Sequence, residues 1–148
     1  MLRLGCVWYC AVLLWVSGMG HAANRYFFLG TVLNYQLVPP TIAAMIAVIL
    51  PWFHLMLCAV LIAPGNRSKA PYLATAMLGL VFVLVQITAL VRGLPIDCGC
   101  FGVVTERPIG AASLLLAGSL IVAGLSAAWS VLPRCGGRVG HPAASDGR

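Results

Sequence analysis

Two cysteines separated by one glycine form the most chemically distinctive feature of the chain. Cys98 and Cys100 lie in the segment Arg92-Gly-Leu-Pro-Ile-Asp-Cys-Gly-Cys-Phe-Gly. A disulfide requires a Cβ–S–S–Cβ torsion of about ±90°, so a ring this small is strained, and the permissive Gly99 makes it feasible. Because strain makes a disulfide easier to reduce, the spacing indicates thiol–disulfide exchange with Cys98 and Cys100 as catalytic residues.

Other interpretations of the cysteine pair are open. A static disulfide would pin the loop, and two free thiols would pack as small apolar groups. A structural zinc site requires four ligands, and this segment supplies two cysteines without a histidine close by. We therefore predict no metal site.

His54 is the second residue with possible chemistry, because it is the strongly ionisable side chain well inside a long apolar stretch. An ionisable group within a membrane span is a functional hypothesis by default. It could relay protons or donate to a quinone carbonyl, which makes a quinone the candidate cofactor. The alternative is a neutral histidine that hydrogen-bonds to a neighbouring helix. His21 is expected near an interface and is not counted as catalytic.

The composition shows which class of protein must position these residues. Of 148 residues, 61% are hydrophobic and 8% are charged, whereas soluble domains carry about 25% charged residues. The formal net charge of +6 is best explained by orientation signals beside membrane spans. These values exclude a soluble domain and argue against a nucleic-acid partner, so the bilayer is the expected surrounding.

The chain contains four apolar stretches long enough to cross a bilayer. They run over residues 4–23, 37–63, 70–91 and 110–132. Pro39 and Pro40 suit a helix start, where a missing N–H costs nothing. We predict an all-α fold, an integral membrane four-helix bundle occupying residues 1–132.

Two further segments complete the predicted organisation. Residues 24–36 contain Tyr26, Phe27, Phe28 and Tyr35, aromatic side chains that favour the headgroup level and predict a short interfacial helix between the first two spans. Residues 133–148 have too little apolar content to pack, which predicts a disordered cytoplasmic tail.

Counting basic residues by side predicts the orientation. The N-terminus, second connection and tail carry six lysines and arginines, against three in the first and third connections. Both termini are therefore expected in the cytoplasm of a multi-pass plasma-membrane protein. The Cys98/Cys100 loop is then extracytoplasmic, where conditions are oxidising. The first span could also be read as a secretory signal peptide, and its cleavage would preserve this orientation.

The remaining cysteines are assigned to packing. Cys6 and Cys10 share one face of the first span and Cys58 lies in the second, where thiols behave as small apolar groups. Cys135 lies in the predicted tail, across the membrane from the cysteine pair, so it cannot resolve a disulfide formed there.

The Arg-Gly, short spacer and Cys-Gly-Cys-Phe-Gly arrangement resembles the methylamine utilisation protein MauE family, grouped with DoxX-like redox-associated membrane proteins. Tyr35-Gln-Leu-Val-Pro39 resembles the family's Tyr-x-x-x-Pro element, and Pro51-Trp-Phe-His54 its Pro-x-x-Glu element. The family usually has a lysine at the position of His21 and a glutamate at that of His54. Both replacements keep an ionisable group but change its charge at neutral pH.

The resemblance implies a role in maturing periplasmic or secreted proteins, in the type case a disulfide-rich subunit of methylamine dehydrogenase. Cys98 and Cys100 would be the redox pair of a thiol–disulfide oxidoreductase component, and a thioredoxin-like or other extracytoplasmic thiol protein its partner. Two alternatives are a non-enzymatic assembly factor in which the loop is only structural, and a transporter or channel. The second is disfavoured because substrate paths are normally lined by several ionisable residues.

Overall fold

The computed structural model describes residues 2–63, 68–94 and 110–131. Its described part is all-helical, in the order α1 (Leu2–Ala23), α2 (Arg25–Asn34), α3 (Pro40–Ile62), α4 (Ala70–Val91) and α5 (Ala111–Trp129). The four longer helices among these are long and apolar enough to span a membrane. The predicted bundle and the short helix between its first two spans are confirmed.

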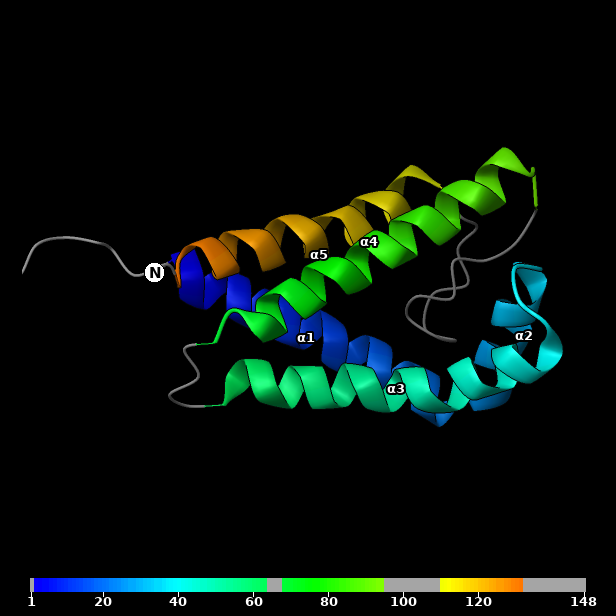
Figure 1. The fold of residues 1–148 in the computed structure, drawn as a ribbon, viewed down its shortest axis with the longest axis horizontal. Helices are drawn as coiled ribbons and strands as arrows, with labels where there is room; N and C mark the ends of the chain where they lie inside the picture. The colour runs from blue at the N-terminus through cyan, green and yellow to red at the C-terminus, as the bar shows by residue number, and fades with distance from the viewer. Residues whose placement is uncertain (1, 64–67, 95–109, 132–148) are drawn as a thin grey trace, which may run out of the picture.

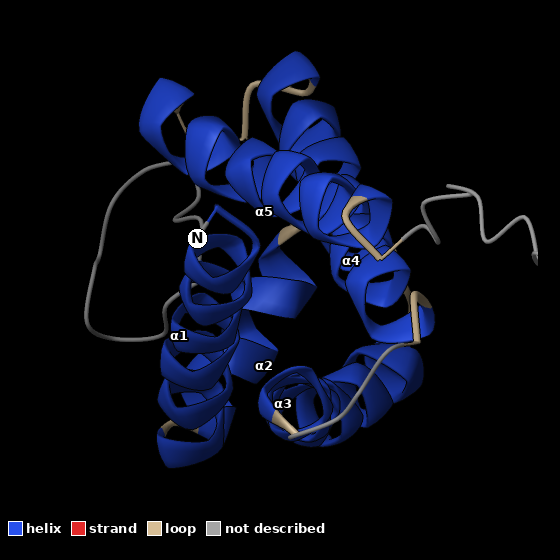
Figure 2. Ribbon diagram, turned by 90° about the vertical axis from the view of Figure 1, so that its left-hand side faces the viewer, coloured by secondary structure: helices blue, strands red, loops and turns tan. Residues whose placement is uncertain are grey.

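The helices form two closely packed pairs, α1 with α3 and α4 with α5. Contacts between α1 and α5 join the pairs, whereas α3 and α4 touch much less. Because successive long helices alternate in direction, α2 and the described ends of the 92–110 connection lie at one end of the bundle, as Figure 1 shows. The end of α3 and the start of α4 lie at the other end, which faces the viewer in Figure 2, where α1 lies beside α3 and α5 beside α4.

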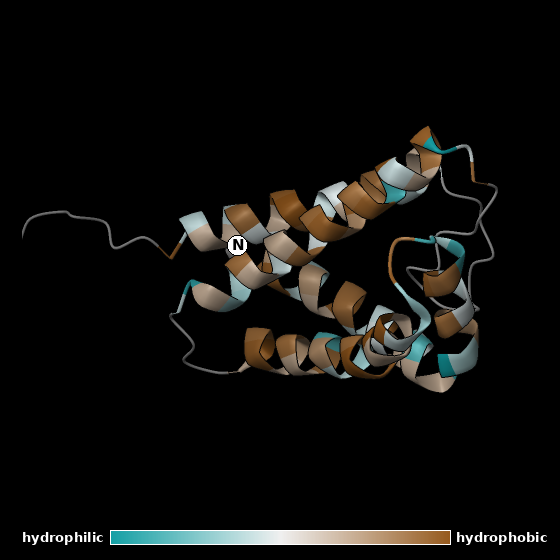
Figure 3. Ribbon diagram, turned by 45° about the vertical axis from the view of Figure 1, so that its right-hand side comes forward, coloured by the Kyte–Doolittle hydropathy of each residue, from teal (hydrophilic) through white to brown (hydrophobic). Residues whose placement is uncertain are grey.

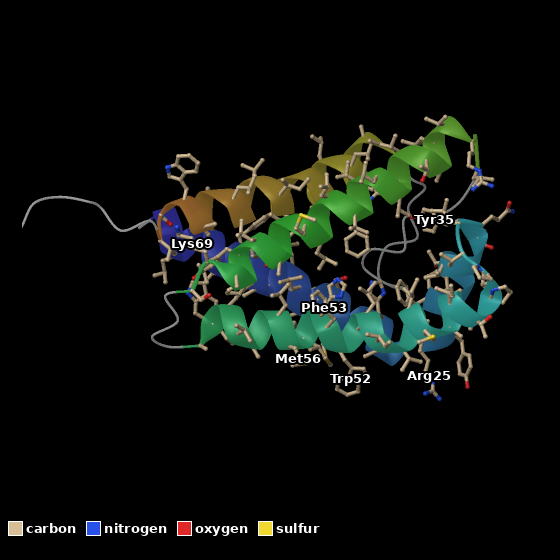
Figure 4. The ribbon with its side chains drawn as sticks, in the orientation of Figure 1. Arg25, Tyr35, Trp52, Phe53, Met56 and Lys69 are labelled. Carbon is tan, nitrogen blue, oxygen red and sulfur yellow. The ribbon has the colours of Figure 1, made fainter. Side chains whose placement is uncertain are left out.

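The outer surface of the bundle is apolar, as a lipid-facing surface must be. Trp52 and Met56 on α3 are 64% and 68% exposed and point away from the other helices in Figure 4. Figure 3 shows hydrophobic positions along the lengths of the long helices. The chain is a multi-pass membrane protein.

Small residues let the helices approach closely. A Cβ atom added to Gly124 on α5 would lie 2.8 Å from the carbonyl oxygen of Tyr72 and 3.0 Å from the backbone nitrogen of Ala76, both on α4. A Cβ on Gly18 of α1 would meet His54 and Leu55 of α3 at 3.1 Å. The sequence therefore sets both helix pairs at short separation, as in other membrane bundles.

This packing makes Gly124→Ala a destabilising substitution. The new methyl group would press on backbone atoms, which cannot rotate away, so we expect a loss of about 1–3 kcal/mol in the free energy of unfolding. Denaturation in detergent, followed by circular dichroism, measures the effect. Gly118→Ala on the same helix is the matched control, because a Cβ there meets nothing within 4 Å. Equal stability of the two variants would contradict the close approach.

The helices differ from the predicted apolar stretches by a few residues at several ends. Within the stretch 37–63, α3 begins at Pro40, where Pro39 and Pro40 predicted a helix start, because Pro39 is extended (φ −63°, ψ 155°) and serves as the N-cap; proline disfavours the helical conformation in the residue before it. The fourth span ends at Trp129, ahead of the expected Leu132. Residues 133–148, the predicted tail, lie outside the described residues.

Candidate functional site

The predicted redox pair, Cys98 and Cys100, lies outside the described residues. The structure does describe the two ends of the connection that carries the pair. Leu94 follows α4 and Gly110 precedes α5, both at the α2 end of the bundle. The candidate site is therefore built from what this end of the bundle contains.

Gly93 ends α4 and turns the chain into the connection. Its φ of +63° is a left-handed conformation that glycine adopts without strain. The Gly93 amide donates to the Leu90 carbonyl at 3.0 Å and the Leu94 amide donates to the Ala89 carbonyl at 3.1 Å. This is a Schellman cap. It explains why a glycine follows the arginine in the Arg-Gly motif, because the cap requires a left-handed residue at this position.

Arg92 ties the end of α4 to the segment between α2 and α3. Its Nη1 donates to the Tyr35 carbonyl oxygen at 2.9 Å, and its Nη2 donates to Gln36 Oε1 at 3.3 Å. Both acceptors lie more than fifty residues away in sequence. Figure 4 shows Tyr35 at this end and Lys69 at the opposite end. One guanidinium thus joins the end of α4 to the segment between α2 and α3.

We expect Arg92→Ala to release the Tyr35–Val38 segment. Loss of a hydrogen bond to a charged group costs about 1.5–3 kcal/mol, so amide exchange there should rise about tenfold or more. Hydrogen–deuterium exchange on peptides covering residues 33–38 measures it. Arg25→Ala is the control, because the Arg25 guanidinium instead lies 5.3 Å from the Tyr26 ring centroid. Equal amide exchange in both variants would show that the hydrogen bonds of Arg92 do not hold the Tyr35–Val38 segment in place.

His54 and His21 meet in the interior of the bundle. Their ring centroids are 5.9 Å apart in an edge-to-face arrangement, and both are buried, at 1% and 0% exposed. The close approach at Gly18 brings α1 and α3 together at this point. His21 lies near the end of α1 as expected, but its side chain is fully buried, and its pairing with His54 was not predicted. The two ionisable side chains predicted at separate places in the sequence therefore lie together in the bundle.

The polar atoms of the histidine pair are only partly satisfied. His54 Nδ1 donates to the Leu50 carbonyl on its own helix at 2.7 Å, and not to a neighbouring helix as the alternative interpretation of this residue expects. Ser17 Oγ lies 3.2 Å from His21 Nε2, and His21 Nδ1 is buried without a hydrogen-bond partner. A buried polar atom left unpaired is costly and uncommon in native proteins.

A cavity of about 310 Å³ lies between α2, α3 and α4. It falls within the size range of small-molecule sites, and its lining is almost wholly apolar. The lining residues are Phe28, Thr31, Val32, Tyr35, Leu37, Val38, Ile46, Leu50, Val81, Phe82 and Val85. The structure thus places a cavity where α3 and α4 separate, at the end of the bundle that holds Arg92.

The histidine pair lies directly behind the cavity wall. His21 stacks on Phe28 with ring centroids 3.9 Å apart, and His54 lies 5.8 Å from the Phe82 centroid. Neither histidine lines the cavity itself. His54 therefore supports the wall, through Phe82 and Leu50, and a ligand in the cavity would meet those side chains first.

The other described cysteines pack as predicted. Cys10 and Cys58 are buried, Cys6 is partly buried, and all three are free thiols. Cys58 Sγ donates to the Ala11 carbonyl at 3.3 Å, across the α1–α3 contact. Cys10 and Cys58 belong to the same apolar core cluster as Val7 and Leu14, so α1 supplies part of the core. Within the described residues no group of three or more histidine, cysteine or acidic side chains could hold a metal ion.

Comparison with known proteins gives two matches. A family model described as "Methylamine utilisation protein MauE" matches residues 1–131. The "Methylamine utilization protein MauE" of Methylophilus methylotrophus is 30% identical over 92 residues, which cover 62% of this chain and 48% of that protein. The matched region is thus about half the length of this curated relative. No solved structure matches.

The family match includes every element described above. It extends over α1 to α5, the histidine pair, the cavity and the segment with the cysteine pair. The family resemblance seen in the short motifs therefore holds along the membrane domain. The chain belongs to the methylamine utilisation protein MauE family.

Proposed function

We propose that the protein carries out thiol–disulfide exchange at the outer face of the membrane, with Cys98 and Cys100 as the exchanging pair. Its clients are extracytoplasmic proteins that need disulfides, and methylamine utilisation is the pathway in which we place them, by analogy with the relative's name. Exchange proceeds by thiolate attack through a mixed disulfide. The disulfide of the pair accepts two electrons from a client dithiol, which becomes a disulfide.

The observation that carries this proposal is the Cys-Gly-Cys segment between α4 and α5 in a MauE-family bundle. The connection starts from a capped helix end, where Gly93 turns the chain and Arg92 is hydrogen-bonded to the α2–α3 segment. These contacts fix the described start of the connection at the α2 end of the bundle.

The orientation we propose places both termini in the cytoplasm and the α2 end outside. It rests on the excess of basic residues in the N-terminus, second connection and tail. The described helices support the grouping of the connections, because α2 and the ends of the 92–110 connection share one end of the bundle. A partner would then be a thioredoxin-like or other extracytoplasmic thiol protein.

Replacement of both cysteines by serine tests the proposal. In cells that lack the endogenous protein, wild-type chain should restore disulfides in extracytoplasmic proteins, and the Cys98→Ser, Cys100→Ser double variant should not. Differential alkylation of free and reduced thiols, read by mass spectrometry, measures the outcome. Cys135→Ser is the matched control and should behave as wild type. Full function of the double variant would overturn the proposal and favour an assembly factor with a structural loop.

A further inference from the structure

We infer that the cavity between α2, α3 and α4 binds a membrane quinone. This rests on the proposed thiol–disulfide function for its role, but the binding site itself is argued from described side chains. The cavity wall is apolar and holds the aromatic rings of Phe28, Tyr35 and Phe82. Flat apolar rings favour a flat ring as ligand, since stacked aromatic pairs gain more than their buried area alone gives.

The cavity is bordered by side chains on the outer surface of the bundle. Val81 on α4 is 51% exposed and Leu37 before α3 is 46% exposed, yet both line the cavity. These residues therefore connect the cavity with the surface that faces lipid, on the side between α3 and α4, which pack less closely than α1 with α3 or α4 with α5. A ligand that enters by this route is lipid-soluble.

The two buried histidines pack against the cavity wall on the side that faces away from the cavity. His21 stacks on Phe28 and His54 packs against Phe82, while the Nδ1–H of His54 donates to the carbonyl of the lining residue Leu50. The rings of Phe28 and Phe82 are thus each held by an imidazole that is itself fully buried. A lipid acyl chain adapts to any apolar groove, whereas fixed ring faces select a planar ligand.

The cavity also lies at the α2 end of the bundle, where the cysteine-bearing connection begins. Tyr35 lines it, and the Tyr35 carbonyl accepts the hydrogen bond from Arg92 at the start of the cysteine-bearing connection. A dithiol that has received two electrons from a client needs a two-electron acceptor before it can act again. A quinone supplies this, because two thiols and one quinone give one disulfide and one quinol, with the two thiol protons ending on the quinol oxygens.

A binding experiment on the full chain in nanodiscs tests the site. Decylubiquinone is titrated and bound quinone is measured after rapid removal of free quinone, using the Cys98→Ser, Cys100→Ser double variant so that no redox step intervenes. Val85→Trp, which fills the cavity from α4, should weaken binding about tenfold, equivalent to about 1.4 kcal/mol. Val91→Trp is the matched control on the same helix, since Val91 is 82% exposed and lies outside the lining, and should change binding less than twofold.

A second variant and a photoreactive quinone distinguish loss of the site from misfolding of the Val85→Trp variant. Leu37→Trp alters the cavity from the non-helical segment and should weaken binding as Val85→Trp does. An azido-quinone should attach to peptides of wild-type protein that contain lining residues. Binding that neither tryptophan weakens, or a phospholipid in the cavity that saturating quinone does not displace, would overturn the inference. Mixed disulfides without quinone binding would refute the site alone, and quinone binding without thiol exchange would refute the proposed function alone.

Discussion

A single serine at Cys98 or Cys100 is expected to trap a client as a mixed disulfide. Thiol–disulfide exchange passes through a bond between one cysteine of the pair and one of the client. In the wild-type chain the second cysteine, only two residues away, resolves this bond at an effective concentration on the order of mM or higher. Without it the adduct should accumulate from undetectable to a major species.

Non-reducing electrophoresis of membranes from cells expressing each variant measures the adduct. At least one single variant should give a band of higher mass that disappears with reductant, and the double variant should give none. The buried thiols of Cys10 and Cys58 are common to all samples and serve as an internal control. If both single variants lack an adduct and retain full disulfide formation, exchange at this pair is excluded.

Charge placed on one member of the histidine pair is expected to unfold the bundle, and opposite charges on both are expected to restore it. His21→Lys or His54→Glu alone introduces an uncompensated charge among fully buried side chains. Such a charge costs about 3–5 kcal/mol. The double variant places a lysine and a glutamate at sites whose present rings are 5.9 Å apart.

A double-mutant cycle in detergent measures this coupling. We expect the double variant to recover at least half of the summed loss of the two single variants. His54→Gln is a neutral control, because its amide retains a donor for the Leu50 carbonyl and should cost much less than His54→Glu. Additive losses in the double variant would show that the two positions do not interact in the membrane.

The spans could be predicted from sequence because each is long, apolar and nearly free of charge, and lipid leaves a helix as the natural structure for such a segment. The short helix α2 followed from its aromatic residues. The start of α3 at Pro40 followed from the two prolines, whereas the apolar stretch itself begins earlier, because Leu37 and Val38 continue the hydropathy signal ahead of the extended Pro39. Hydropathy reports burial in lipid, whereas the helix start depends on local backbone geometry.

The site was predicted less completely. His54 stands out in the sequence because it is an ionisable group within a span, but its contact with His21 depends on how α1 and α3 cross. Gly18 was the available signal, since it lies three residues before His21 and permits the close approach to His54. The cavity had no local signal, because its lining comes from α2, the following segment, α3 and α4. Such a site exists only once these elements are packed.

Thiol labelling of intact cells tests the central claim most directly. Cells expressing the full chain are treated with a membrane-impermeant maleimide before and after a mild reductant, and wild type is compared with the Cys98→Ser, Cys100→Ser double variant. We predict labelling only after reduction and only in the wild type, which would place a labile disulfide of this pair outside the membrane. Absence of labelling under both conditions, with Cys135 labelled only after permeabilisation, would contradict an outward-facing exchange pair.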